Sequence, residues 1–173
     1  TKRDAGDVVV MVPRERPDRN ASVVVLEIEG EASVDNSRAF DVEAPGTVTL
    51  WAKDAALTKG VELEQVEGWE YLGMWHGRDG TANWEVDAPP GAYRIEIEFG
   101  CAPGSAGNQF VLTCAGRTIR GLVPPTREWR DFQWLYAGRI EIGPGASHSL
   151  KVAPTSDLKG ALMNIRSVRL VPE

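Results

Sequence analysis

Short apolar stretches separated by turn residues are the feature that most restricts the fold of this chain. In the clearest stretch, 92–101, apolar and charged residues alternate, which is the pattern of a strand with one buried face. Signals for turns recur at a spacing of roughly 8–12 residues. We therefore expect an all-β protein, a two-sheet jelly-roll β-sandwich. The segments expected to form strands are 7–12, 21–30, 46–52, 82–86, 92–101, 108–116, 117–123, 132–142, 148–154 and 162–171.

Composition fits a globular protein and argues against two classes of partner. The chain has 173 residues, with 18 Gly, 11 Pro and a net charge of −6. Its basic residues form no long cluster, so we expect no nucleic-acid binding. No stretch approaches 18 apolar residues, so we expect no membrane-spanning segment. The first residues lack the apolar core of a signal peptide, which suits a cytosolic protein or a fragment of a longer one, and we favour the fragment.

The two cysteines, Cys101 and Cys114, are expected to be buried free thiols. The loop between them, 102–108, is expected to join an antiparallel pair of strands. In such a hairpin Cys114 lies about five residues deeper, and at about 3.4 Å per residue the pair is too far apart for a disulfide bond. Both cysteines are also in phase with apolar neighbours.

Residues able to carry catalysis form no known constellation. The only histidines, His76 and His148, have no metal-ligand spacing, and there is no phosphate loop or nucleophile elbow. Acidic residues such as Glu96, Glu98 and Glu141 alternate with apolar residues, as on the solvated face of strands. A carboxylate pair for glycoside hydrolysis is still compatible with the sequence. We expect no cofactor, and no enzyme activity from this chain by itself.

Six tryptophans are many for this length. Trp84 alternates with apolar residues and is expected in the core, while Trp51 is expected beneath a sheet edge and Trp69 could be either. Trp75 and Trp129 lie among turn residues, where an indole can cover the apolar face of a sugar ring. For Trp129 we favour a ligand platform over a cap on the core, because large aromatics seldom lie in loops except for recognition. For Trp75 both interpretations stay open.

Four segments in a fixed order resemble one known family. They are a strand, Pro-Gly turn and strand at 80–98, a Thr-x-x-Trp loop in 124–133, a strand, Gly turn and strand at 140–152, and a closing Asn-containing strand at 161–170. Together they resemble carbohydrate-binding module family 6 and its close relatives. The resemblance covers most of the chain after residue 46 and implies a jelly roll that binds an oligo- or polysaccharide.

The first 44 residues resemble a different protein. Segment 7–31 is similar to the end of the β-sandwich that follows the catalytic barrel in glycoside hydrolase family 29, the α-L-fucosidases. We therefore expect two parts: strands of a preceding β-sandwich plus linker in 1–44, and a carbohydrate-binding module-like β-sandwich in 45–173. The resemblance implies a carboxyl-terminal fragment of a secreted or periplasmic enzyme, covalently linked to its catalytic domain.

The family-6 resemblance also implies a binding site. It assigns Trp129 as the stacking platform and Asn164 as the hydrogen-bonding amide. A second aromatic residue usually stands where this chain has Met74, so either the adjacent Trp75 forms the second wall or the pocket is one-sided. Asn164 has an alternative role as a turn residue whose side chain bonds the backbone.

In one respect the chain departs from the family. Members often hold a structural Ca²⁺ with acidic residues, but Lys53 and Arg166 occupy the matching positions here. Both would repel the ion, and a one-residue shift in a strand would turn the nearby Asp54 to the opposite face. We expect no metal site.

Taken together, these features predict a non-catalytic carbohydrate-binding module that keeps a hydrolase near its polymer. The main alternative is a structural interdomain sandwich without sugar binding, and a third is an enzyme in its own right. Exposure of Trp129 and Trp75 would discriminate between the first two.

Overall fold

The computed structural model describes residues 2–4, 7–9, 44–145 and 148–173. The chain divides into two compact units, Thr1–Asn36 and Ser37–Glu173. In the first unit β1 (Lys2–Asp4) and β2 (Asp7–Val9) pair antiparallel. The strand expected at 21–30, and the end of the one expected at 7–12, lie outside the described residues.

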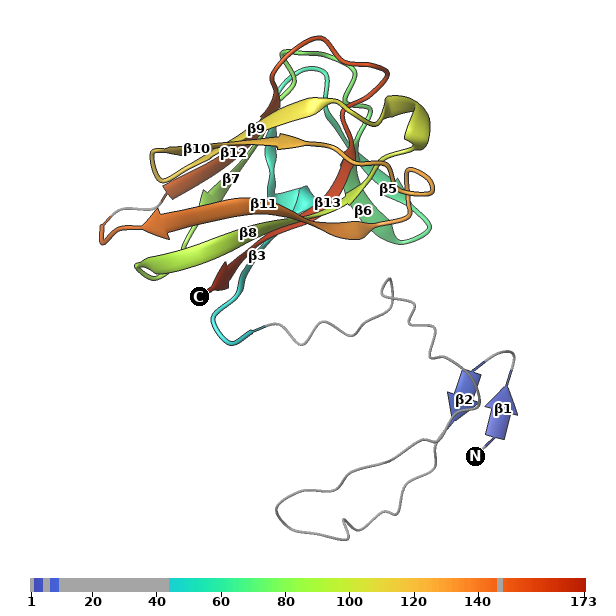
Figure 1. Cartoon of the computed structure of the whole chain (residues 1–173), viewed down its shortest axis with the longest axis horizontal. Coiled ribbons are helices and arrows are strands. Elements are labelled where there is room, and N and C mark those ends of the chain that lie inside the picture. The colour runs from blue at the N-terminus through green and yellow to red at the C-terminus, as the bar shows by residue number, and fades with distance from the viewer. Residues whose placement is uncertain (1, 5–6, 10–43, 146–147) are drawn as a thin grey trace, which may run out of the picture. The chain divides into compact units, whose positions relative to one another are not determined.

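Two antiparallel sheets form the second unit (Figure 1). A five-stranded sheet has the order β10-β9-β12-β7-β4, and a six-stranded sheet has the order β11-β8-β13-β6-β5, with β3 also paired to β13. This confirms the predicted two-sheet jelly roll. The strands are β3 (Val48–Trp51), β4 (Ala56–Leu57), β5 (Glu62–Val66), β6 (Trp69–Gly73), β7 (Ala82–Val86), β8 (Gly91–Gly100), β9 (Gln109–Cys114), β10 (Arg117–Leu122), β11 (Gln133–Ile142), β12 (His148–Pro154) and β13 (Asn164–Pro172), with short 3-10 helices η2 (Ala52–Asp54) and η3 (Pro103–Ser105).

The core lies between the two sheets, and β8 illustrates how the sequence builds it. Its four alternating apolar residues, from Tyr93 to Phe99, are at most 3% exposed, while the charged residues between them face outward. Phe110 and Leu112 of β9 oppose them from the other sheet and are fully buried. Trp84 is also in the core, as predicted, and its indole N–H donates to the Trp51 carbonyl at 2.8 Å. The outward charged residues of β8 therefore belong to the free face of the six-stranded sheet.

The hairpin β5–β6 was not among the strands that the sequence predicted. It is closed by Glu67 and Gly68, with φ of 53° and 83°, the left-handed pair of a two-residue hairpin turn. This hairpin forms the edge of the six-stranded sheet and contributes directly to the site described below.

Cys101 and Cys114 are buried free thiols, as predicted, but the expected hairpin between them is wrong. Cys101 directly follows β8 of the six-stranded sheet and Cys114 ends β9 of the five-stranded sheet, because the connection between β8 and β9 crosses from one sheet to the other. Burial raises the pKa of the Cys114 thiol from 9.0 to about 11. Burial raises the pKa of the Cys101 thiol as well, and a raised pKa disfavours the reactive thiolate.

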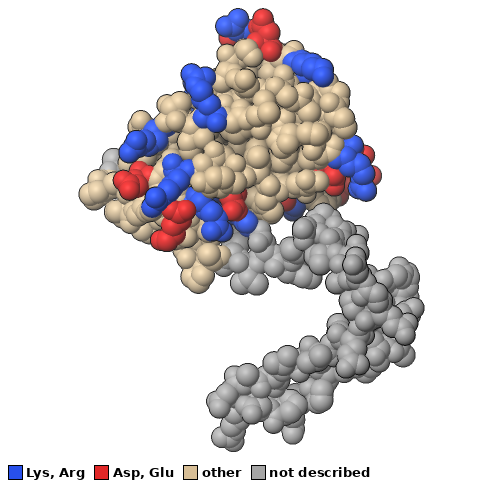
Figure 2. Space-filling model, viewed as in Figure 1, with Lys and Arg blue, Asp and Glu red and all other residues tan. Residues whose placement is uncertain are grey.

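The molecular surface in Figure 2 carries basic and acidic side chains close to one another, with no extended area of either sign on the face shown. Among the described residues, no helix has the length and apolar character needed to cross a bilayer.

Candidate functional site at one end of the six-stranded sheet

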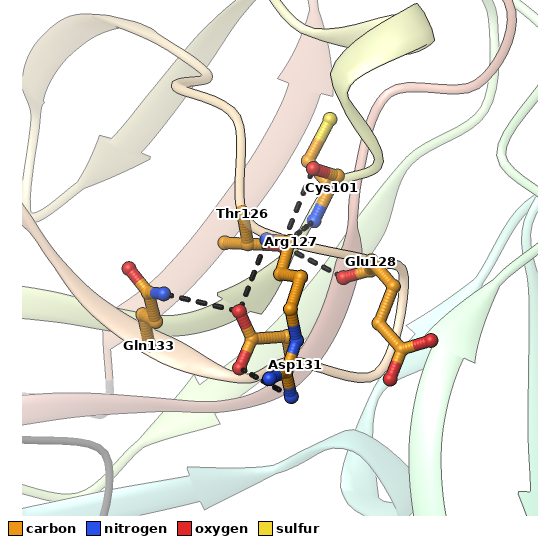
Figure 3. Close-up of polar contacts among 6 residues, drawn as sticks. All are labelled: Cys101, Thr126, Arg127, Glu128, Asp131 and Gln133. Atoms are coloured by element: carbon orange, nitrogen blue, oxygen red, sulfur yellow. Dashed lines mark hydrogen bonds and ion pairs between the residues drawn. The ribbon is translucent and has the colours of Figure 1, made fainter. Parts of the chain in front are cut away.

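The loop 124–133 is anchored to the end of β8 through Thr126 (Figure 3). The amide of Thr126 donates to the Cys101 carbonyl at 2.8 Å, and the amide of Cys101 donates to the Thr126 hydroxyl at 2.9 Å. That hydroxyl is buried and lies 2.7 Å from the Glu128 carbonyl, to which it can donate. The threonine of the Thr-x-x-Trp pattern therefore fixes where the loop begins.

The rest of the loop is closed by Asp131 (Figure 3). Its carboxylate accepts from the amide of Arg127 at 3.0 Å and from the side chain of Gln133 at 3.2 Å. The amide of Asp131 donates to the Glu128 carbonyl at 3.2 Å. Trp129 thus stands on a turn held from both sides, which limits the entropy lost when a ligand orders it.

Trp129 meets Asn164 where the loop crosses the ends of β8 and β13. The side-chain amide of Asn164 donates to the backbone carbonyl of Trp129 at 3.0 Å. That carbonyl lies directly over Gly100, since a Cβ atom there would be 2.3 Å from its oxygen. The Trp129 side chain is partly buried and packs against the core, so part of the ring stays at the surface. The core packing of Trp129 and the backbone hydrogen bond of Asn164 are the contacts expected of the structural interpretations, while the partial exposure of Trp129 is compatible with a ligand platform.

Two side-chain oxygens, one from Glu64 and one from Asn164, lie close to Gly73, the last residue of β6. A Cβ atom at Gly73 would lie 2.6 Å from Glu64 Oε2 and 3.2 Å from Asn164 Oδ1. Tyr71 lies opposite Glu64 across the hairpin. Burial raises the pKa of the Tyr71 phenol, and the hydrogen bond with Glu64 and the negative charge of Glu64 raise this pKa further. Since Asn164 donates with its nitrogen, its oxygen is oriented as an acceptor. The lack of a Cβ at Gly73 thus lets the two oxygens approach its backbone, with Glu64 partly exposed and Asn164 only 7% exposed.

Met74 and Trp75 follow Gly73 and point in different directions. Met74 is 49% exposed and has a φ of +50°, and the amide of His76 donates to its carbonyl at 2.9 Å. This sharp turn sends Trp75 inward, where it is 0% exposed and its indole N–H donates to the Gly80 carbonyl at 3.1 Å. The assignment of Trp75 as a ligand-binding wall is corrected: it is a core residue. Of the two positions that the resemblance assigns to aromatic residues, one holds a partly exposed Trp129 and the other an exposed Met74.

The positions compared with the family's calcium ligands carry two cationic side chains and one nearby carboxylate. Lys53 and Asp54 lie exposed on η2, and Arg166 forms an ion pair with Glu98 at 2.8 Å. Within the described ranges, no three His, Cys, Asp or Glu side chains are grouped as metal ligands. The expectation of an unbound calcium position stays a prediction.

Glu64 is the site residue that the sequence reasoning missed. It stands between Leu63 and Gln65 as a charged residue does on any partly exposed strand, so the residue type alone did not indicate a site. Recognising Glu67-Gly68 as a hairpin turn would have paired Glu64 with Tyr71 and brought it near Gly73.

The chain matches no protein-family model and no curated protein, but solved structures share its fold. A family 35 carbohydrate binding module from Clostridium thermocellum superposes with a TM-score of 0.60 at 17% identity, over 73% of this chain and 98% of that one. The module CBM6cm-2 from Cellvibrio mixtus lichenase 5A, in complex with cellotriose, gives 0.56 at 18% identity, over 73% and 97%.

A GH26-CBM35 β-(1,4)-mannanase from Podospora anserina gives a TM-score of 0.58 at 18% identity, over 74% of this chain. The present chain spans only 28% of that enzyme, which therefore contains much that this chain lacks. At these identities, the similarity establishes a shared jelly-roll fold.

Proposed function

We propose that this chain is a non-catalytic carbohydrate-binding module. The observation that supports it most is that the loop carrying the partly exposed Trp129 meets Asn164 and Glu64 at one end of the sheet. A partly exposed indole suits a sugar ring, whose C–H face stacks on it, and the sugar's hydroxyls can donate to a nearby carboxylate such as that of Glu64. The solved structures with this fold include modules named for carbohydrate binding, one of them in complex with cellotriose.

Attachment to a hydrolase is the second part of the proposal. The match to part of a mannanase chain supports a role beside a catalytic domain, where the module raises the local concentration of substrate. The resemblance of segment 7–31 to α-L-fucosidases favours a fucosidase-like parent that is secreted or periplasmic. The purified chain should then release no product from aryl-fucosides. Turnover that disappears on mutating a single carboxylate would contradict this.

The alternative of a purely structural sandwich has its own support, because Trp129 also packs against the core and Asn164 bonds the backbone. A glycan array followed by titration of Trp129→Ala and Glu64→Gln separates the two functions. We expect a loss of affinity on the order of 1–3 kcal/mol for Trp129→Ala and a smaller loss for Glu64→Gln.

Leu122→Ala, at a residue 59% exposed on β10 of the other sheet, is the matched control. It should bind as the unmodified chain does. A large fall in melting temperature for Trp129→Ala with an unchanged sugar titration would favour the structural alternative.

A further inference from the structure

Phe132 packs against two aromatic residues of the hairpin β5–β6 and so joins this hairpin to the loop 124–133. Its ring is stacked on that of Trp69, with the ring centroids 6.0 Å apart and the planes inclined by 7°. It also contacts the Tyr71 ring, at a centroid distance of 5.6 Å and an angle of 55°. Both separations lie in the range of favourable aromatic pairs, about 4.5–7 Å. We name Phe132, Trp69 and Tyr71 the aromatic cluster.

The hairpin side of the aromatic cluster is held in place by contacts of its own. Tyr71 is only 4% exposed, and its phenol is hydrogen-bonded with Glu64. Trp69 is 46% exposed, but the Arg166 guanidinium lies 4.2 Å from its ring centroid, close enough for a cation–π interaction. Arg166 is in turn paired with Glu98 at 2.8 Å. The two hairpin rings therefore form a surface of fixed orientation on which the loop can pack.

On the loop side, Phe132 gives the turn that carries Trp129 a further attachment point. The anchors described above hold the loop to the ends of β8 and β13, through Thr126 and through the Trp129 carbonyl. Toward the hairpin, the ion pair of Arg130 with Glu67 at 3.1 Å joins two exposed side chains and contributes little. The aromatic cluster is therefore the stronger of these two attachments of the loop to the hairpin.

This attachment links the two sides of the loop-end site, by which we mean Trp129, Asn164 and Glu64. The Trp129 ring belongs to the loop, and the Glu64 carboxylate belongs to β5 of the hairpin. Tyr71 contacts Phe132 with its ring and Glu64 with its hydroxyl, so one series of contacts connects the loop to the carboxylate. A binding site keeps its geometry when neighbouring side chains fix the groups that contact the ligand.

We propose that Phe132 is a positioning residue for the loop-end site. By packing on the hairpin it fixes where the Trp129 ring lies relative to Glu64. Trp69, whose role the sequence left open, supports this contact and is not a ligand platform of its own. Without the Phe132 ring, the Trp129 ring has to be ordered when a ligand binds, which weakens binding. The consequence for saccharide binding rests on the proposed function, whereas the position of Trp129 in the free protein does not.

The test uses the full chain and its variants Phe132→Ala, Phe132→Tyr and Trp69→Ala, with Leu122→Ala as the matched control. NMR first follows the indole N–H signals without saccharide, and the Trp129 signal is the one that Trp129→Ala lacks. We expect this signal to shift or broaden in Phe132→Ala and Trp69→Ala, and to keep its position in Phe132→Tyr, which retains the ring. The Trp84 signal should not move, because that N–H is hydrogen-bonded and the ring is buried in the core.

Titration with cellotriose, mannotriose and laminaritriose then measures the effect on binding. Phe132→Ala and Trp69→Ala should each weaken the binding of a trisaccharide by about 3- to 10-fold, and Phe132→Tyr should bind as the unmodified chain does. The double variant Phe132→Ala/Trp69→Ala should lose no more affinity than either single variant, because both substitutions remove the same contact.

Trp69→Ala keeps the test decisive if Phe132→Ala fails to fold, because Trp69 is the more exposed ring of the stacked pair. An unchanged Trp129 signal in the alanine variants, or additive losses of affinity in the double variant, overturns this inference and leaves the proposed function standing. If the unmodified chain binds no saccharide on the glycan array, the proposed function is overturned. The Trp129 signal, measured without saccharide, then still decides whether Phe132 positions the loop.

Discussion

At the scale of single residues, Gly100 and Asn164 both contact the backbone of Trp129. The Trp129 carbonyl rests against the backbone of Gly100 and accepts from the Asn164 side chain. Both contacts involve the backbone of Trp129, whereas its ring packs against the core. A substitution at 129 therefore tests the ring, and a substitution at 100 tests the position of the loop.

Gly100→Ala should displace this loop. The added Cβ would lie 2.3 Å from the Trp129 oxygen and 2.9 Å from its carbonyl carbon, and backbone atoms cannot rotate away. We expect a destabilisation of about 1–3 kcal/mol in chemical denaturation, together with weaker saccharide binding.

Gly104→Ala is the control for this change, because a Cβ there meets nothing within 4 Å. Its stability should stay within about 0.5 kcal/mol of the unmodified chain. Equal stabilities for the two alanine variants would mean that the loop does not sit on Gly100 in solution.

At the scale of elements, Glu64 and Tyr71 belong to the hairpin β5–β6. The conformation of its turn therefore affects where these two side chains lie at the edge of the site. Glu67 holds a left-handed conformation that favours asparagine in this type of turn. Its ion pair with Arg130, at 3.1 Å, joins two exposed side chains and adds little stability.

Glu67→Asn should therefore stabilise the protein, by a few tenths to about 1 kcal/mol in thermal or chemical unfolding. Glu67→Gln removes the same charge without relieving the backbone and should be neutral or slightly destabilising. If both variants lose stability equally, the ion pair with Arg130 outweighs the conformational effect.

The same hairpin, compared with β8, shows which elements could be predicted from the sequence and which could not. Strand β8 was predictable because alternation over ten residues reports directly on one buried face. The hairpin was not, since Glu67-Gly68 is a weaker turn signal than Asn-Gly and Glu62–Val66 has a mixed apolar and charged pattern. Trp129 was singled out both by its turn surroundings and by the resemblance, and Asn164 by the resemblance; the structure joins the two by a hydrogen bond. The burial of Trp75 depends on the turn at Met74, which residue type alone does not reveal.

At the scale of the whole molecule, stability is expected to come from the core between the sheets without a bound cation. Arg166 already pairs with Glu98, and Lys53 places a second positive charge on η2. Neither residue provides the oxygen ligands that Ca²⁺ requires.

The melting temperature should accordingly be the same in excess EDTA and in millimolar Ca²⁺. Magnesium at equal concentration controls for ionic strength. A rise of several degrees with Ca²⁺ alone would indicate ligands near Asp54 and an error in aligning these strands with the family.

The contact between Trp129 and Asn164 also has a consequence for folding. Glu64 belongs to one of the first strands of the sandwich, Trp129 to the loop 124–133 and Asn164 to the last strand, so the loop-end site joins segments that are distant in the sequence. Contacts of this kind have a high contact order and form only after long loops have closed. During synthesis, the site is therefore completed when β13 has left the ribosome and paired. Gain of saccharide affinity would then serve as a kinetic marker for the final step of folding.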